Sequence, residues 1–466
     1  MKRVLVIARM FPPFHPVGFS IRVVKFIKYL PALGWLPSVL TVADRNESEL
    51  DPKQGSATML SEIPREVVIH RTRAGAPLRF LDKDSALQGR NRLTRLLIKL
   101  LRGARRRLIY GLLLPDHCVG WLPFALTRGR DIVRSEGIDI ILATCPPYST
   151  TLIGACLKVL TGKRLLLDFR DDWIDTTEFR AKGPIRRMIE RKMERWSIHV
   201  ADKVVLVTEA SKHDFMERHS KECGNKFVVI PNGCDLEEFA ALQSMRVTRD
   251  YSKFTIVHAG SLIDSGPWTR SAAAVFRAVR GVLQQEPELA ERLSLVFAGD
   301  FPERHRYLAN EIGLSGVIEE LGYLPHEEVL GVMKSADLLM AIATEGRPTA
   351  IPGKIYEYWA VGGPPILLLS GAGAASTLVE RNGLGMTVDP ADVAGIQEAI
   401  LRVYRMSKSP TPLRVNSSGI EAHDRKTLSR QLAHLLSTVS DGESGPVGSG
   451  YKRRSQAGRE NRSVQP

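Results

Sequence analysis

Cysteine is scarce in this chain of 466 residues, and its five cysteines show no regular spacing. No two of them lie at the short interval of a zinc site, and an odd number cannot all pair in disulfides. The composition therefore argues against a disulfide-stabilised secreted domain and a structural zinc module. It predicts a protein of the reducing cytoplasm. The five residues are Cys118, Cys145, Cys156, Cys223 and Cys234.

Long apolar runs are also missing, since none approaches the roughly 20 residues of a membrane-spanning helix. The opening MKRVLVIARMFPP has only a short apolar run, and Pro12 and Pro13 follow it without a small-residue cleavage site. This differs from a secretory signal peptide, so we interpret residues 4–8 as a first buried strand.

The G-x-G-x-x-G motif of dinucleotide-binding domains is absent after this strand, where a proline-rich loop ends in Gly18. We therefore expect no NAD in the first domain. A helix beginning near Gly18 can still face a diphosphate or a sugar. Histidine and carboxylate pairs with metal-ligand spacing are lacking too, so we expect no metal and no cofactor.

Positive charge is in excess, with a formal net charge of +14. Such chains bind nucleic acid, anionic membranes or phosphorylated ligands. In the segment 90–114, arginine and lysine recur at helical spacing beside a leucine face. This basic amphipathic helix either lies on an anionic membrane surface or packs its leucines on the first domain. No aromatic residues are interleaved with the charges, so we expect no nucleic-acid partner.

Short unbroken apolar runs alternate with helical patterns, which predicts α/β domains with parallel sheets covered on both faces. Two such series predict two Rossmann-like, doubly wound domains facing a cleft, at 1–240 and 250–418. A helix at 419–439 and a disordered tail at 440–466 follow. The predicted strands are 4–8, 38–42, 66–70, 139–144, 164–169, 203–208, 226–233, 254–261, 294–300, 317–324, 338–343, 364–371 and 385–390.

Ligands of such sheets bind at the carboxyl ends of the strands, where this chain carries unusual polar residues. The segment DFRDDW places Asp168, Arg170, Asp171 and Asp172 directly after a buried strand. Buried charge is costly unless it is paired, so the cluster is either a structural ion-pair network or part of the site. We favour the site, with Arg170, Asp171 and Asp172 as the catalytic candidates.

The segment IPGKIYEYWAVGGPP predicts a helix that starts near Pro352 and ends before a buried strand. The free N–H groups of its first turn, together with Lys354, suit an anion such as a diphosphate. Glu357 lies about one turn further on, where a carboxylate can accept hydrogen bonds from sugar hydroxyls. The alternative is a capped helix whose Lys354 and Glu357 are simply solvated.

Further candidates follow other strands. Ser149 and Thr151 cap a helix after TCPPY, and Asn232 lies where the two domains must meet. In the second domain, the turn after 254–261 carries Ser261 and Arg270, which could contact phosphates. We expect these residues to face the cleft.

The chain resembles bacterial glycosyltransferases of family 4, which have the two-domain GT-B architecture and use nucleotide-sugar donors. The resemblance covers most of residues 1–440. It rests on the order and spacing of FPP…G, TCPPYS, DFRDDW, PNGCD, HAGSL, LGYLPHEEVLGVMKSADLLM and PGKIYEYWAVGGPP.

The resemblance implies roles for individual residues. Glu357 matches the second glutamate of the family's E-x7-E element, which holds the donor ribose, and Thr349 stands at the first. The start of the helix at Lys354 and Ile355 would face the diphosphate, and Gly18 matches the glycine loop of the first domain.

Other positions depart from the family's pattern. Ser261 stands where the family has an arginine, for which Arg270 is a substitute. Thr150 and Thr151 stand where relatives often carry a histidine. The last helix, which carries Arg425, is expected to cross back to the first domain.

The resemblance also implies an activity: metal-independent, retaining transfer of a hexose from a nucleoside-diphosphate sugar. Its acceptor would be a glycan or glycolipid in surface polysaccharide assembly, at the cytoplasmic face of a membrane. Two alternatives stay open. One is a sugar-nucleotide 2-epimerase of the same fold, and the other is a catalytically weak partner subunit that binds nucleotide or membrane.

Overall fold

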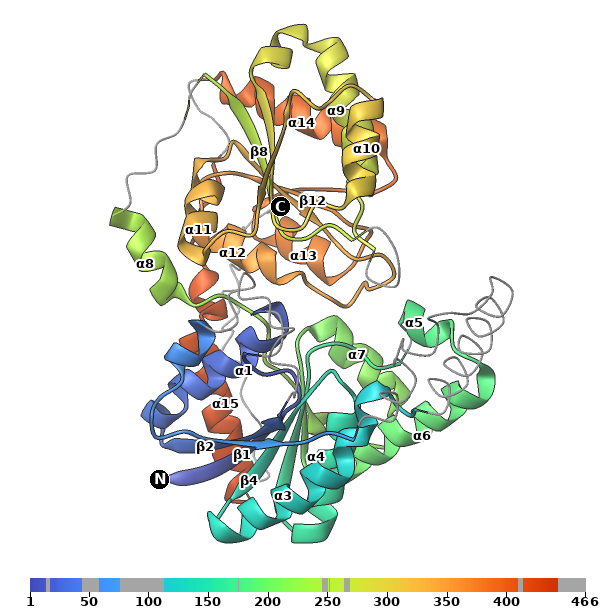
Figure 1. Cartoon of the computed structure of the whole chain (residues 1–466), viewed down its shortest axis with the longest axis vertical. Coiled ribbons are helices and arrows are strands. Elements are labelled where there is room, and N and C mark those ends of the chain that lie inside the picture. Colours follow the sequence, from blue (N-terminus) through green and yellow to red (C-terminus); the bar gives the residue numbers. More distant parts are fainter. Residues whose placement is uncertain are drawn as a thin grey trace, which may run out of the picture.

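A computed structural model of the chain describes most of it, and Figure 1 shows two lobes stacked along the long axis. The basic segment 90–114 lies outside the described residues except for its last two positions, and so does the tail beyond 442. The described residues are 1–13, 17–43, 58–75, 113–174, 176–244, 250, 252–263, 269–409 and 414–442.

The first lobe is built on a seven-stranded sheet in the order β3-β2-β1-β4-β5-β6-β7. Every neighbouring pair is parallel. The central strands are unbroken apolar runs and are almost completely buried, as expected for a sheet covered on both faces. The strands are β1 (Lys2–Ala8), β2 (Trp35–Val42), β3 (Val68–Thr72), β4 (Ile140–Cys145), β5 (Arg164–Phe169), β6 (Lys203–Leu206) and β7 (Phe227–Val229).

The second lobe is built on a six-stranded sheet in the order β10-β9-β8-β11-β12-β13, also parallel throughout. Both orders reverse beside the first strand of the lobe, which creates a switch point where ligands of such sheets bind. The strands are β8 (Phe254–Ala259), β9 (Leu293–Ala298), β10 (Ile318–Gly322), β11 (Leu338–Ile342), β12 (Ile366–Leu369) and β13 (Gly385–Val388). The prediction of two doubly wound parallel-sheet domains is confirmed.

Helices cover both faces of the first sheet. One hydrophobic cluster joins α1 to β1 and β2, and the other joins α3, α4, α6 and α7 to the opposite face. Local signals set the helix ends: Pro184 opens α6, Gly162 ends α4 in a left-handed conformation, and the hydroxyl of Thr208 caps α7. The helices of this lobe are α1 (Val17–Tyr29), α3 (Leu122–Ser135), α4 (Ser149–Thr161), α5 (Thr177–Arg180), α6 (Pro184–Val200) and α7 (Glu209–Arg218). The next helix, α8 (Leu236–Ser244), packs in a hydrophobic cluster of the second lobe.

The second sheet is covered in the same way, by α9, α10 and α14 on one face and by α11, α12 and α13 on the other. The helices are α9 (Ala273–Gln285), α10 (Glu303–Glu311), α11 (His326–Ser335), α12 (Gly353–Val361), α13 (Ala374–Arg381) and α14 (Val393–Ser407). No helix in the described part of the chain is long and apolar enough to cross a bilayer.

The last helix, α15 (Arg425–Ser440), belongs to the first lobe although it follows the second in sequence (Figure 1). Leu428, Leu432 and Leu436 are buried in the same cluster as α1 and the first strands. The indole of Trp35 donates a hydrogen bond of 3.2 Å to the Ser437 hydroxyl. The predicted crossing of the last helix to the first domain is therefore confirmed.

The chain passes between the lobes twice, and the two passages lie side by side. Cys234 and Asp424 form a parallel β-bridge, in which the Cys234 amide donates to the His423 carbonyl at 3.2 Å. A Cβ atom at Gly233 would lie 1.8 Å from that carbonyl oxygen. Only glycine fits there, because any side chain would overlap the neighbouring passage.

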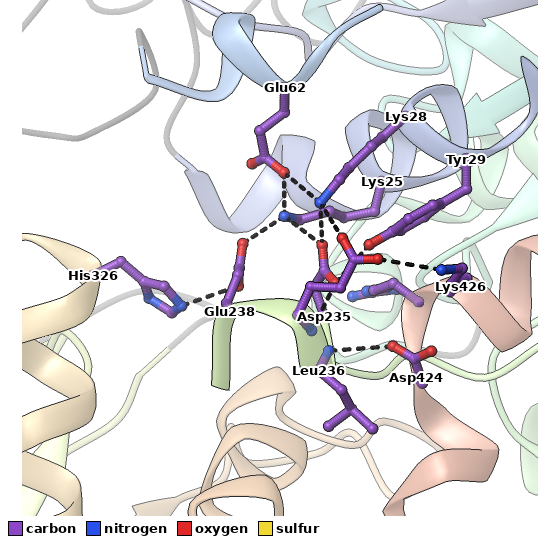
Figure 2. A network of polar contacts seen from close by, with 12 residues as sticks. Lys25, Lys28, Tyr29, Glu62, Asp235, Leu236, Glu238, His326, Asp424 and Lys426 are labelled. Carbon is purple, nitrogen blue, oxygen red and sulfur yellow. Dashed lines mark hydrogen bonds and ion pairs between the residues drawn. The ribbon is translucent and has the colours of Figure 1, made fainter. Parts of the chain in front are cut away.

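A buried polar network joins α1 to the first of these passages (Figure 2). The ammonium of Lys25 pairs with Glu62, Asp235 and Glu238, and it is 1% exposed. These three carboxylates lie close enough together to hold a metal ion, but the Lys25 ammonium already supplies the cation. Burial alone would lower the pKa of Lys25, yet the charge of Glu238 and hydrogen bonds to the three carboxylates raise it above its usual value.

The same network extends toward the second lobe. Asp235 accepts hydrogen bonds from Lys28 at 2.9 Å and from the Tyr29 hydroxyl at 2.7 Å. On its other side, Glu238 lies 3.1 Å from His326 at the start of α11. The network thus links the first lobe, the passage and the second lobe through charged groups.

Candidate active site

The carboxyl end of β5 and the loop after β11 face each other across the cleft and enclose a small cavity. Its volume is about 200 Å³. Arg170, Asp171 and Asp172 line it from the first domain, and Arg347 and Thr349 line it from the second. Four residues predicted for the site from different parts of the sequence are therefore brought together: the three catalytic candidates and Thr349.

Asp172 joins the two domains directly. One of its carboxylate oxygens accepts a hydrogen bond of 2.6 Å from the Thr349 hydroxyl, and the other accepts one from the Ser211 hydroxyl. The Thr349 carbonyl in turn accepts from the Thr208 hydroxyl at 2.8 Å. Thr208 is the N-cap of α7, so its hydroxyl serves both the helix and the domain contact.

Asp171 faces a cation from the other domain, since its carboxylate accepts from the Arg347 guanidinium at 3.3 Å. Burial raises the pKa of Asp171, while the positive charges of Arg347 and Arg170 oppose that shift. A carboxyl group with a raised pKa inside a cleft is a candidate for proton transfer or for hydrogen bonding to a sugar.

Arg170 and Asp168 are engaged in support of the first domain. Arg170 donates to the carbonyls of Cys145 and Pro146, at 3.1 and 2.6 Å, and so holds the loop after β4. Asp168 forms a buried ion pair of 2.9 Å with Arg22 and accepts from the Thr144 hydroxyl. Within the charged cluster, therefore, Asp168 has the structural role and Asp171 and Asp172 face the cavity.

A second group of candidates lies at the start of α12. The Lys354 ammonium donates to the Glu357 carboxylate at 2.8 Å, and both side chains are partly exposed. Ile355 is fully buried in the core of the second domain, so its side chain cannot touch a ligand. Its amide donates to the Pro352 carbonyl within the first turn.

Arg270 and Ser261 lie near the end of β8. The main chains of Ile263 and Arg270 pair as a short antiparallel bridge, which returns Arg270 to this edge of the sheet. The Ser261 hydroxyl lies 3.1 Å from the Tyr323 hydroxyl and accepts from the Asp300 amide at 3.3 Å. The Nε atom of Arg270 is buried without a hydrogen-bond partner.

His258 is a buried polar residue near the end of β8. Its Nδ1 atom lies 3.0 Å from the Met340 carbonyl, and its Nε2 atom is buried without a partner. Burial is the main cause that lowers the pKa of His258, to about 4, and the positive charges of Arg270 and Lys354 lower it further.

Other predicted site residues lie elsewhere. Ser149 and Thr151 are fully buried in the first turn of α4, where the Thr151 hydroxyl donates to the Tyr148 carbonyl at 2.7 Å. The structure therefore does not bring them to the cleft.

Two further candidates lie beside the passage between the domains and in α1. Asn232 accepts from Arg22 at 3.3 Å, beside the passage. Gly18 lies in the first turn of α1, after residues that the structure does not describe.

Comparisons with known proteins identify the family to which this two-domain fold belongs. Residues 253–406 match the family model described as "Glycosyl transferases group 1", and residues 99–238 match that of "Glycosyltransferase Family 4". The chain is a glycosyltransferase of the family 4 type. No curated protein sequence matches it significantly.

Solved glycosyltransferases share the GT-B fold of this enzyme at low sequence identity. An α,α-trehalose-phosphate synthase (UDP-forming) from Burkholderia vietnamiensis is 13% identical with a TM-score of 0.65, over 95% of this chain and 100% of that one. A lipopolysaccharide outer core galactosyltransferase is 12% identical with a TM-score of 0.56, over 94% and 99%. A glycosyltransferase from Rickettsia africae is 14% identical with a TM-score of 0.56, over 95% and 96%.

Sequence reasoning missed two residues of this glycosyltransferase that lie beside the predicted ones. His258 is a polar residue inside an otherwise apolar strand, which is a signal that could have singled it out. Tyr323 follows β10 directly, at the same edge of the sheet as Ser261. His258 lies at the second-last position of β8, and Tyr323 follows the last residue of β10.

Proposed function

We propose that the second domain binds a nucleoside-diphosphate sugar, with Arg270 and Lys354 at the diphosphate and Glu357 at the ribose. The start of α12 adds the partial positive charge of a helix N-terminus. Thr349 and the main chain near Ser261 would line the sugar and phosphate positions, and Gly18 would approach from the first domain.

One observation carries the proposal. Arg270 and Lys354 follow the neighbouring parallel strands β8 and β11, so both belong to the carboxyl edge of the second sheet. Among the residues that the structure describes, the Arg270 Nε atom has no hydrogen-bond partner. Two cations at one sheet edge, one of them with an unused N–H donor, suit the charge and the oxygen atoms of a diphosphate.

The reaction proposed is transfer of a hexose with retention of the anomeric configuration. The bond between the anomeric carbon and the diphosphate breaks as the acceptor oxygen bonds to that carbon from the same side, and the proton of the acceptor hydroxyl passes to the departing diphosphate oxygen. Arg270, Lys354 and the start of α12 stabilise the departing diphosphate, so a metal ion is not needed. Asp171 and Asp172 would orient the acceptor or the sugar, and contact between the domains would exclude water.

The acceptor proposed is a glycan or glycolipid of surface polysaccharide assembly, used at the cytoplasmic face of a membrane. This part rests on the family resemblance and on the basic segment 90–114. Its test is product analysis by mass spectrometry with extracted membrane glycolipids as acceptors, in the presence and absence of EDTA. Equal product with EDTA is expected, and loss of product would contradict metal-independent transfer.

The donor site is tested by a thermal-shift screen of the purified protein against UDP, GDP, ADP, TDP and NAD. We expect one nucleoside diphosphate to raise the melting temperature and NAD to have no effect. Glu357→Ala should abolish the shift, whereas Glu311→Ala, an exposed change on α10, should preserve it. No shift with any diphosphate would overturn the donor site.

A second candidate is binding of the nucleotide with little turnover. The Thr349 hydroxyl donates to Asp172, and Thr150 and Thr151 are fully buried, so none of these threonines offers the donor sugar the carboxylate or imidazole of the family. Nucleotide binding without donor hydrolysis or transfer would favour this candidate.

A further inference from the structure

The helix α6 carries an outward face on which apolar and basic side chains alternate. Ile185 is 71% exposed, Met188 is 51% exposed and Trp196 is 39% exposed. Arg187, Met188, Arg191 and Arg195 line a shallow hollow of about 330 Å³ along the helix, together with Pro184 and Lys192. Exposed large apolar residues gathered on one helix mark a contact surface rather than chance exposure.

The charges of α6 are sorted between its two faces. Its acidic residues, Glu190 and Glu194, are fully buried. Glu190 accepts from Lys182 and Arg186, each at 2.7 Å, and Glu194 lies 2.9 Å from His219. Both acidic residues are buried and paired. The charged side chains on the exposed side of the helix are therefore basic, and they lie among the exposed apolar ones.

The position of α6 relates this face to the site. Thr176, which precedes the short α5, and Arg180, which ends it, line the cleft cavity, and α6 begins four positions after Arg180. Figure 1 shows α5 and α6 together at one side of the first domain. A surface bound along α6 would therefore lie close to the first-domain side of the cavity.

We propose that this face of α6 docks on a membrane whose surface carries anionic phospholipid headgroups. Arg187, Arg191, Lys192 and Arg195 would meet the headgroups, while Ile185, Met188 and Trp196 would enter the boundary with the acyl chains. The apolar side chains favour a bilayer over a nucleic acid, which would use the cations alone. The proposal needs no sugar transfer, so it stands or falls separately from the proposed function.

The test is co-sedimentation of the full chain with vesicles of phosphatidylglycerol and phosphatidylcholine, and with vesicles of phosphatidylcholine alone. We expect binding to the anionic vesicles only. Each cation near an anionic surface strengthens binding roughly fivefold, so replacing Arg187, Arg191 and Arg195 by alanine should weaken it roughly 100-fold. The matched control replaces Arg277, Arg280 and Arg304 of the second domain, all outside α6, and should keep most of the binding.

Two further variants separate a membrane from other polyanions. Ile185→Ser with Met188→Ser should also weaken vesicle binding, whereas binding that persists would indicate a purely electrostatic surface and overturn the proposal. Brominated lipids should quench the wild-type tryptophan fluorescence, and Trp196→Phe should remove most of that quenching. Trp35, Trp121, Trp173 and Trp359 are buried and serve as the internal reference.

Two other results would overturn the proposal: no binding of the wild type, or unchanged binding of the arginine variant. Circular dichroism and the melting temperature show whether each variant is folded, and neither depends on nucleotide binding. A folded variant that fails to bind vesicles is the expected result.

Discussion

The Thr349 hydroxyl donates a 2.6 Å hydrogen bond to the Asp172 carboxylate, which ties the loop after β11 to the end of β5 across the cleft. Asp172 belongs to the first domain and Thr349 to the second, 177 positions apart in the sequence. The pair holds the two sides of the cavity at a fixed spacing, so an acceptor and a donor would have to fit between groups that already touch.

Thr349→Val should weaken this domain contact. The substitution removes the donor and leaves an Asp172 oxygen without its partner, a loss of about 1 kcal/mol. For domains of this size we expect a fall of about 2–4 °C in the melting temperature, measured by calorimetry. Thr127→Val is the control, because that exposed hydroxyl bonds only to the Pro123 carbonyl of its own helix. Equal melting temperatures for the two variants would show that the hydrogen bond between Thr349 and Asp172 does not stabilise the protein.

Arg270→Met should weaken binding of the nucleoside diphosphate that gives the largest thermal shift. A hydrogen bond to a charged group contributes about 1.5–3 kcal/mol, so the dissociation constant should rise roughly ten- to hundredfold. Isothermal titration calorimetry measures this directly, with Arg280→Met on the exposed face of α9 as the control. If both variants bind as the wild type does, Arg270 is not at the diphosphate.

Asp235→Asn should destabilise the protein in a pH-dependent way. Burial would raise the pKa of Asp235, but hydrogen bonds and charge from Lys25, with further bonds from Lys28 and Tyr29, lower it from 3.8 to about 2. A shift of this size contributes roughly 2 kcal/mol of stability at neutral pH.

Because the folded pKa is depressed, this contribution is present above the unfolded value of 3.8 and is lost as the pH falls toward 2. Urea unfolding should therefore show a large difference between wild type and Asp235→Asn at neutral pH and a smaller one in acid. Glu303→Gln, on the surface of α10, should differ little at either pH. A difference that does not depend on pH would show that the charge of Asp235 is not its source.

Gly233→Ala should disrupt the place where the two chain passages run together. A Cβ atom there would lie 1.8 Å from the His423 carbonyl oxygen, far inside any tolerated contact. We expect little soluble protein, or a melting temperature reduced by more than that of any surface variant, measured by yield and calorimetry. Gly316→Ala is the matched control, since no atom lies within 4 Å of its added Cβ.

The strands were predictable because their signal is local. β4, β5 and β12 each contain a run of apolar residues, as burial on both faces of a parallel sheet requires. Polar residues at strand ends could be placed near the cleft for the same reason, which is why Asp171 and Asp172 were singled out, whereas Thr349 was named only through the family resemblance.

The roles of individual polar residues could not be predicted, because their partners are distant in sequence. Asp168 is neutralised by Arg22, 146 positions away, and nothing in DFRDDW separates it from the two aspartates that face the cavity. Ser149 was expected in the cleft, yet its amide donates to Asp116 from another loop and the residue is fully buried. Charge pairing and helix packing decide these outcomes, and neither is visible in a local pattern.

The bridge between Cys234 and Asp424 has a mechanical consequence. Two covalent connections that run side by side define one line, and rotation of the domains about that line changes neither connection's length. Twisting or sliding would stretch one connection against the other and break their shared hydrogen bonds. We therefore expect the softest motion of the domains to be a rotation that opens or shuts the cleft, and opening would break the hydrogen bond between Asp172 and Thr349.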